Sequence, residues 1–155
     1  LPDAAYLTLA TNTARVVILA RGSDTFAAWY QREFTDTTLA LAQFAQQDSG
    51  GAGITHFERY AFGLDPHQPL ADGLPRPFMH QGRLVVTFRK PLGVTDVTYN
   101  IRGLTDLREA AGSQVPVELI PAPDGSDDPQ RVYYQVTPPA AGAPRAFIQV
   151  KAEWK

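Results

Sequence analysis

The side chains best suited to chemistry in this chain are hydrogen-bonding groups that alternate with apolar residues along its second half. If the apolar residues face a core, the outward positions carry amides, guanidinium groups and hydroxyls. These positions are Thr87, Arg89, Thr98, Asn100, Arg102, Tyr133, Gln135, Gln149 and Lys151. Such groups replace the hydrogen bonds of water to sugar hydroxyls, and an aromatic ring, here Tyr133, packs against the flat C–H surface of a pyranose. The pattern favours carbohydrate binding, with the ordinary solvated side of a sheet as the alternative.

Catalytic and metal-binding patterns are weak by comparison. The chain has no cysteine, no G-x-S-x-G nucleophile elbow and no G-x-x-x-x-G-K-[ST] phosphate loop. The histidines, His56, His67 and His80, lack the regular spacing of a zinc motif, although folding can bring His67 and His80 together. The carboxylates of residues 124–128 lie in a turn-like segment, whereas a glycosidase needs two carboxylates held rigidly about five to nine ångströms apart. We therefore expect a protein that is not an enzyme and that needs no cofactor.

Strand-like segments position these side chains. Alternation with a period of two predicts five strands, within residues 82–90, 97–103, 115–121, 131–138 and 146–154. Turns rich in Gly, Pro and Asp separate them, which is typical of an antiparallel β-sandwich. The predicted core positions are Leu84, Val86, Phe88, Val97, Tyr99, Ile101, Val132, Tyr134, Val136, Ile148 and Val150. Trp154 shares the parity of Val150 and either closes the core or is exposed, so it is a second aromatic candidate.

A small arm of short helices precedes the strands. Asp24 or Thr25 offers a cap for the first helix. Four aromatic residues then group on one helical face and predict a buried core rather than a ligand platform. These residues are Phe26, Trp29, Tyr30 and Phe34. A second helix is expected within residues 38–47.

The third helix has sequence signals at both of its ends. Thr55 and Glu58 have the spacing of a capping box, and Gly63 is placed to end the helix in the left-handed conformation. Pro66 prevents continuation. The proline-rich residues 67–77 predict an extended crossing that leads into the strands.

The segment GITHFERYAFGLDP, residues 53–66, resembles a junction written roughly DGDGxxNxxEYAxGxDP. That junction is typical of C-terminal modules of large secreted bacterial proteins, many of them polysaccharide-degrading. The matching residues are Gly51, Gly53, Tyr60, Ala61, Gly63, Asp65 and Pro66. The later segments LVVTFRKP, VTYNIRGLTDL and RAFIQVK follow the same order as in those modules, so the resemblance covers residues 26–155. It implies a secreted accessory module, similar to a carbohydrate-binding module.

This chain differs from the family pattern at the positions where the junction carries acidic residues. Aligning Tyr60 with the family tyrosine places Asp48, Gly50 and Ala52 at the usual aspartates, and His56 and Arg59 at the usual asparagine and glutamate. Calcium requires six to eight oxygen ligands, several of them charged, and one carboxylate does not supply such a site. We predict a glycine turn that does not bind calcium.

Composition and charge narrow the class of protein. The 155 residues carry a net charge of -2 without a basic patch, so bulk charge attracts neither nucleic acid nor an anionic membrane. The longest apolar run, residues 16–20, is too short to cross a bilayer. The chain begins at Leu1 without a signal-peptide pattern, which indicates a removed signal or an excised module. The absence of cysteine leaves the compartment open.

These observations lead to one expected organisation. Residues 1–23 form a strand hairpin, which belongs either to a preceding domain or to the edge of the sandwich. Residues 24–66 form the helical arm with its glycine loop, and residues 67–155 form the β-sandwich. We expect a non-catalytic carbohydrate-binding module of a secreted bacterial glycoside hydrolase, specific for plant-type β-glycans such as cellulose or β-glucan and linked to a catalytic domain.

The predicted ligand-binding residues are Tyr133, Trp154, Arg89, Asn100, Arg102, Gln135 and Gln149. A structural or sorting module that docks a secreted protein to its neighbours or to the cell envelope is the alternative. A free-standing enzyme ranks third.

Overall fold

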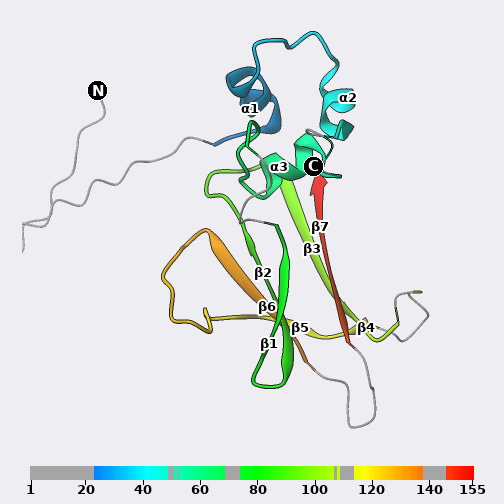
Figure 1. Ribbon diagram of the computed structural model, residues 1–155, viewed down its shortest axis with the longest axis vertical. Coiled ribbons are helices and arrows are strands. Elements are labelled where there is room, and N and C mark those ends of the chain that lie inside the picture. Colours follow the sequence, from blue (N-terminus) through cyan, green and yellow to red (C-terminus); the bar gives the residue numbers. More distant parts are fainter. Residues whose placement is uncertain are drawn as a thin grey trace, which may run out of the picture.

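The computed structural model describes residues 23–48, 51, 53–68, 74–106, 108, 114–137 and 146–155. This part of the chain is mainly β, with two antiparallel sheets and three short helices at one end (Figure 1). The helices are α1 (Phe26–Glu33), α2 (Leu41–Gln46) and α3 (His56–Ala61). The strands are β1 (Arg76–His80), β2 (Arg83–Arg89), β3 (Val97–Leu104), β4 (Gln114–Val115), β5 (Val117–Ile120), β6 (Arg131–Val136) and β7 (Phe147–Trp154). A mainly β chain with a short helical arm is confirmed, whereas the hairpin expected near the N-terminus lies outside the described residues.

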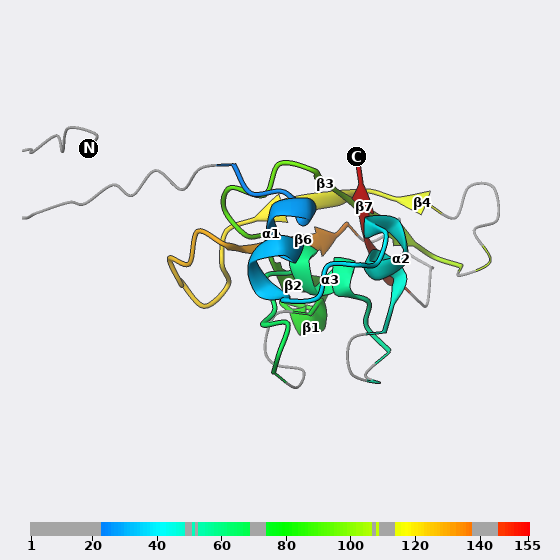
Figure 2. The ribbon, with the colours of Figure 1, turned by 90° about the horizontal axis from the view of Figure 1, so that it is seen from above.

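Each sheet combines pairing between consecutive strands with one pair of strands that are distant in the sequence. The first sheet has the order β1-β2-β6-β5 and the second has the order β4-β3-β7. Strands β3 and β7 are paired over eight residues, from Val97 with Trp154 to Leu104 with Phe147. Seen from above, the helices lie over one end of the strands (Figure 2). None of the helices in the described part of the chain is long and apolar enough to cross a membrane.

The first sheet contains a strand that the sequence pattern did not predict. Residues 67–77 were expected to be an extended crossing, but β1 begins at Arg76 and pairs with β2 as a hairpin. Pro77 lies within this strand, and its missing N–H is tolerated because β1 is at the edge of the sheet. The prediction of a crossing is therefore wrong for its last two residues.

The strand expected over residues 115–121 divides at Pro116. Its first part, β4, pairs with β3 in the second sheet, and its second part, β5, pairs with β6 in the first. The two sheets come close together here, at Gly103. A Cβ atom at this glycine would lie 2.8 Å from Val115 Cγ2 and 3.0 Å from Val117 Cγ2. Glycine is required at this position because any larger residue would overlap the crossing segment.

Apolar residues of the two sheets pack against each other at the positions predicted from alternation. Phe88 of β2 is fully buried, and its ring stacks on Tyr99 of β3 at 5.7 Å between centroids and on Tyr134 of β6 at 5.9 Å. Phe62, which follows α3, meets Phe88 edge-on at 5.7 Å. Ile101 and other half-buried apolar residues complete this cluster. The polar residues that alternate with them on β3 consequently point to the opposite side.

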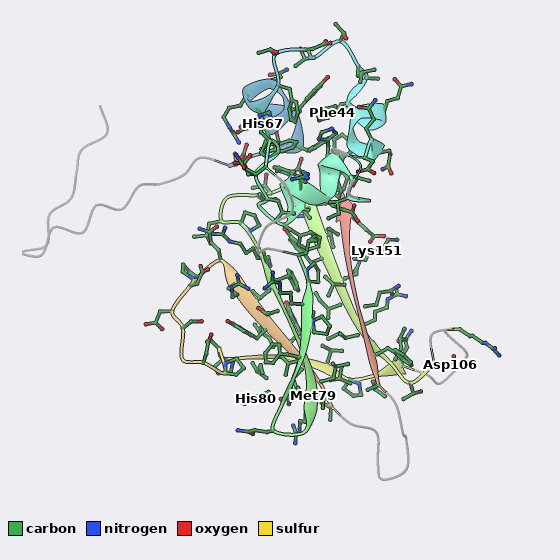
Figure 3. The ribbon with its side chains drawn as sticks, viewed as in Figure 1. Phe44, His67, Met79, His80, Asp106 and Lys151 are labelled. Atoms are coloured by element: carbon green, nitrogen blue, oxygen red, sulfur yellow. The ribbon has the colours of Figure 1, made fainter. Side chains whose placement is uncertain are left out.

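The helical arm has its own aromatic core. Phe26 is completely buried and lies 5.4 to 5.6 Å, ring to ring, from Trp29, Phe57 and Tyr60. Phe44 of α2 stacks on Tyr30 at 4.0 Å (Figure 3). The aromatic face predicted for α1 is therefore a core, as expected.

The helix ends also follow the sequence signals. Thr25 caps α1 by accepting the Ala28 N–H at 3.3 Å, so it, rather than Asp24, is the N-cap. Thr55 and Glu58 form the predicted capping box at the start of α3. Gly63 has a φ of 63° and ends this helix, as predicted.

Two described glycines of the loop that precedes α3 have a left-handed backbone. Gly51 and Gly53 have φ angles of 73° and 71°, which glycine adopts without strain. The Asp48 carboxylate accepts the Gly53 N–H at 3.1 Å. The surviving carboxylate of the junction therefore holds the described end of this loop, and the prediction that the loop does not bind calcium stays a prediction.

One carboxylate attaches the arm to the sheets. Asp96, in the loop that leads into β3, accepts the Tyr60 hydroxyl at 2.7 Å through Oδ1 and the Phe26 N–H at 2.8 Å through Oδ2. Burial, followed by this hydrogen bond, raises the pKa of Tyr60 well above its ordinary value. The Tyr60 hydroxyl therefore stays protonated and donates its hydrogen bond at ordinary pH. Through the Asp96 side chain, α1 and α3 are both joined to the start of β3.

Candidate functional site

A hollow of about 280 Å³ lies on the side of β3 and β7 that points away from the first sheet. Its five lining side chains alternate along the two strands with the apolar residues of the core. They are Asn100, Arg102, Gln149, Lys151 and Glu153. We call these five residues the polar face. Lys151 extends from β7 at the side of the molecule (Figure 3).

Strand register places the polar face in adjacent rows. Arg102 is paired with Gln149, and Asn100 is paired with Lys151 in the next row. Directly paired side chains project to the same side of a sheet with Cβ atoms about 5 Å apart, and diagonal neighbours lie about 7 to 8 Å apart. A guanidinium, an ammonium and two amides therefore occupy a patch of the size of a few sugar rings.

Hydrogen bonds order one end of the polar face. The Lys151 ammonium lies 2.6 Å from Glu153 Oε1, and the Asn100 amide donates to Glu153 Oε2. The hydrogen bond from Lys151, followed by its Coulomb attraction, lowers the pKa of the Glu153 carboxyl. Glu153 is thus an ionised acceptor that holds a neighbouring amide and ammonium in place before any ligand binds.

An apolar pair continues the polar face beyond Arg102 and Gln149. Phe147 of β7 is paired with Leu104 of β3, and both share the parity of the polar residues. Leu104 is buried and Phe147 is half-buried. Phe147 is the ring that the sequence interpretation missed, although the alternation that assigned Ile148 and Val150 to the core already placed it on the polar side.

The structure brings together three of the seven predicted ligand-binding residues. Asn100, Arg102 and Gln149 lie in the polar face. Arg89, Tyr133 and Gln135 belong instead to the first sheet, on the side that carries Thr87. The expectation of a single polar face that combines all these residues is therefore corrected, because their strands pair within two different sheets.

The environment of Tyr133 also differs from the expectation of a solvent-facing ring. Only 6% of Tyr133 is exposed, and its ring meets Phe78 of β1 edge-on at 6.5 Å. Its hydroxyl lies 3.3 Å from Ser126 Oγ. Gln135 is similarly buried and donates to Glu118 Oε1 at 2.9 Å. In this arrangement the ring of Tyr133 has little free surface on which a sugar could stack.

Trp154, which the sequence predicted either to close the core or to be exposed, does both in part. Its ring packs against Phe26 at 5.4 Å and Phe57 at 6.3 Å, on the core side of β7. The residue nevertheless remains 41% exposed. Trp154 therefore closes the edge of the arm core and lies on the opposite side of β7 from the polar face.

A second concavity, of about 450 Å³, lies between α1 and the residues of the YAFGLDP segment. We call it the arm groove. The loop between β2 and β3 forms its third wall, where Leu92 is 52% exposed. Within it Arg32 donates two hydrogen bonds to the Asp24 carboxylate, at 3.2 and 3.0 Å, and one to Glu33 at 2.9 Å. His67 Nε2 lies 3.0 Å from the Glu33 carbonyl oxygen (Figure 3).

The described residues contain no group of three or more His, Cys, Asp or Glu side chains arranged to hold a metal ion. His67 lies in the arm groove, whereas His80 lies at the far end of the β1–β2 hairpin (Figure 3). The two histidines that folding could have brought together are thus at different ends of the molecule.

In the described part of the chain, the polar face and the arm groove are concave surfaces on which a functional argument can be built. One offers a row of hydrogen-bonding groups on rigid strands, and the other lies between α1, the YAFGLDP segment and the loop between β2 and β3. In comparisons with known proteins, no family model, no curated protein and no solved structure matches this chain.

Proposed function

We propose that this chain is a non-catalytic carbohydrate-binding module of a secreted bacterial glycoside hydrolase, built as a β-sandwich with a helical arm. The observation that carries the proposal is the polar face, in which two amides, a guanidinium, an ammonium and a carboxylate line one hollow. These groups offer both donors and acceptors, which is what a ligand covered with hydroxyls requires.

The backbone that carries these side chains supports the proposal. The polar face lies on strands β3 and β7, which are paired over their whole length, so its groups are held in fixed rows rather than on loops. Glu153 holds Asn100 and Lys151 in place through hydrogen bonds. A preorganised set of donors loses less conformational entropy when a sugar binds.

Phe147 supplies the apolar component that such a site needs. It continues the row that begins with Gln149, so a sugar ring that donates to the amide can place its C–H surface against the aromatic ring. We assign the stacking role to Phe147 in place of Tyr133. The ligand is a plant-type β-glycan, and binding raises the local concentration of substrate for a linked catalytic domain.

Affinity electrophoresis tests this function. The chain is run through gels that contain soluble β-glucan, xyloglucan, xylan or mannan, with pull-down on insoluble cellulose alongside. Retardation by a glycan that is lost in Gln149→Ala and Phe147→Ala supports the proposal. Arg83→Ala is the matched control, because Arg83 is a solvent-facing β2 residue of the other sheet. No retardation on any glycan counts against the function.

The arm groove favours a second candidate, a structural or sorting module that docks a secreted protein to its neighbours. The groove exposes Leu92 beside a cluster of charged residues, a combination found at protein–protein contacts. This candidate predicts no affinity for glycans. Loss of docking to envelope material on Leu92→Asp, with the polar face unchanged, would distinguish it from the first.

A further inference from the structure

Two arginines lie directly opposite each other on the first sheet. Arg89 of β2 is paired with Arg131 of β6, so both side chains project to the same side of the sheet with Cβ atoms about 5 Å apart. Both residues are half-buried. Like charges that face each other across two strands destabilise the pairing. An anion held between the two side chains would remove this repulsion.

The carboxylates of the neighbouring loop do not take that place. In the described part of the chain, no salt bridge joins a carboxylate to Arg89 or to Arg131. The loop between β5 and β6 carries Asp124 and Asp128, and each carboxylate accepts a backbone N–H two residues further on, at 3.0 and 2.9 Å. The pKa of Asp124 is lowered first by its hydrogen bonds from Ser126 and last by the charge of Arg131. These carboxylates are thus engaged in their own turns.

Hydroxyl groups occupy the adjacent row on the same side of the sheet. Thr87 is paired with Tyr133, and each lies two residues from one of the two arginines, about 7 Å along its strand. Only 8% of Thr87 is exposed, and its Oγ1 is buried without a hydrogen-bond partner among the described residues. Buried hydroxyls are nearly always hydrogen-bonded, so this atom points to an acceptor that a ligand would supply.

We propose that the Arg89–Arg131 pair binds a tetrahedral oxyanion, a phosphate or sulfate group, one of whose oxygens accepts the Thr87 hydroxyl. A guanidinium presents its donors as a planar fork that matches two oxygens of such a group. A doubly charged group neutralises both arginines, whereas a singly charged ion offsets only one of them. The site lies on the first sheet, away from the polar face, so it does not depend on the proposed carbohydrate function.

Thermal melting of the whole chain in sodium phosphate and in sodium chloride of equal ionic strength tests the site. The wild type is expected to melt higher in phosphate, since a ligand that binds only the folded state stabilises it. In chloride, Arg131→Gln is expected to melt no lower than the wild type, because it removes the like-charge contact. Titration calorimetry should show that Arg89→Gln and Arg131→Gln each weaken the binding of inorganic phosphate by about tenfold, the effect of losing a hydrogen bond to a charged group.

Arg83→Gln is the control, because Arg83 lies on the same side of β2 at the opposite end of the strand from Arg89, 3.7 Å from Glu118. It should keep the full gain in phosphate. Equal gains for the wild type and Arg131→Gln overturn the inference, because the general effect of the salt would then explain them. A variant that melts lower than the wild type by the same amount in both salts also overturns it, because the arginine would then have a structural role alone.

Glycerol 3-phosphate distinguishes the source of the group. Binding at least as tight as that of inorganic phosphate supports the site and assigns it to a phosphate ester on a larger molecule. Weaker binding of the ester supports the site and assigns it to the free ion. If the wild type binds neither compound in calorimetry, the inference is wrong, whatever the outcome of the glycan experiments.

Discussion

Replacing Asp96 by alanine is expected to loosen the attachment of the helical arm to the sheets. The carboxylate accepts the Tyr60 hydroxyl at 2.7 Å and the Phe26 N–H at 2.8 Å. A hydrogen bond to a charged group contributes about 1.5 to 3 kcal/mol. Tyr60 keeps a second acceptor, the Asp24 carbonyl oxygen at 3.0 Å, so the lower end of this range applies. The expected loss in the free energy of unfolding is about 3 kcal/mol for Asp96→Ala and about half of that for Asp96→Asn.

Urea unfolding followed by tryptophan fluorescence measures this effect. Trp29 and Trp154 both contact Phe26, so their emission reports on the arm core next to Asp96. Combining Asp96→Ala with Tyr60→Phe in a double-mutant cycle isolates their shared hydrogen bond, for which we expect a coupling energy of about 1 kcal/mol.

Asp36→Ala serves as the control for this cycle. Asp36 also accepts two hydrogen bonds through its carboxylate, but both come from the exposed Thr38. We expect it to leave the free energy of unfolding nearly unchanged, because surface substitutions of this kind have little effect. The reasoning is refuted if Asp96→Ala has an effect as small as this control, or if the effects of the Asp96 and Tyr60 variants simply add.

Three further predictions concern packing, pH and calcium. Gly103→Ala is expected to destabilise the fold by about 1 to 3 kcal/mol in urea unfolding, because its Cβ meets Val115, and adding Val115→Ala should recover part of the loss. Burial, followed by the charge of Arg59, lowers the pKa of His56 from its ordinary value of 6.5. The unfolded chain then binds the proton more readily, so stability is full above pH 6.5 and falls as the pH drops below it. His56→Gln should therefore lose less melting temperature than the wild type between about pH 7.5 and about pH 5.5, and an equal loss would contradict this assignment. Calcium should leave the melting temperature unchanged, and a rise of several degrees that a chelator reverses would show that the glycine turn does bind it.

Local patterns in the sequence predicted the local structure well. Alternation placed Asn100, Arg102 and Gln149 on the outward side of their strands, and the capping residues located the start of α3. These features depend on residues that are close in the sequence. The same reasoning gave the aromatic face of α1, because residues three and four positions apart share one side of a helix.

Strand pairing could not be predicted in this way. Parity shows which side chains share a side of one strand, but not that β3 pairs with β7 while β2 pairs with β6. Outward residues of both sheets were consequently combined into one site. The missed strand β1 also explains the wrong expectation for Tyr133. Pro77 made β1 look unlike a strand in the sequence, and Phe78 of β1 is the residue that packs against the Tyr133 ring. The burial of a side chain depends on its neighbours across the sheet, so it follows from topology rather than from residue type.

The wide sequence separation of the paired strands also determines how the chain folds. Val97 is paired with Trp154, and two pairings, β3 with β7 and β2 with β6, join distant parts of the chain. Among the described strands, the other three pairings join consecutive strands: β1 with β2, β3 with β4, and β5 with β6. Closing long loops costs entropy before the contacts that reward it exist, and such topologies refold in milliseconds to seconds rather than microseconds. The polar face, which needs both β3 and β7, is therefore assembled late, after the pairs of consecutive strands and the helices.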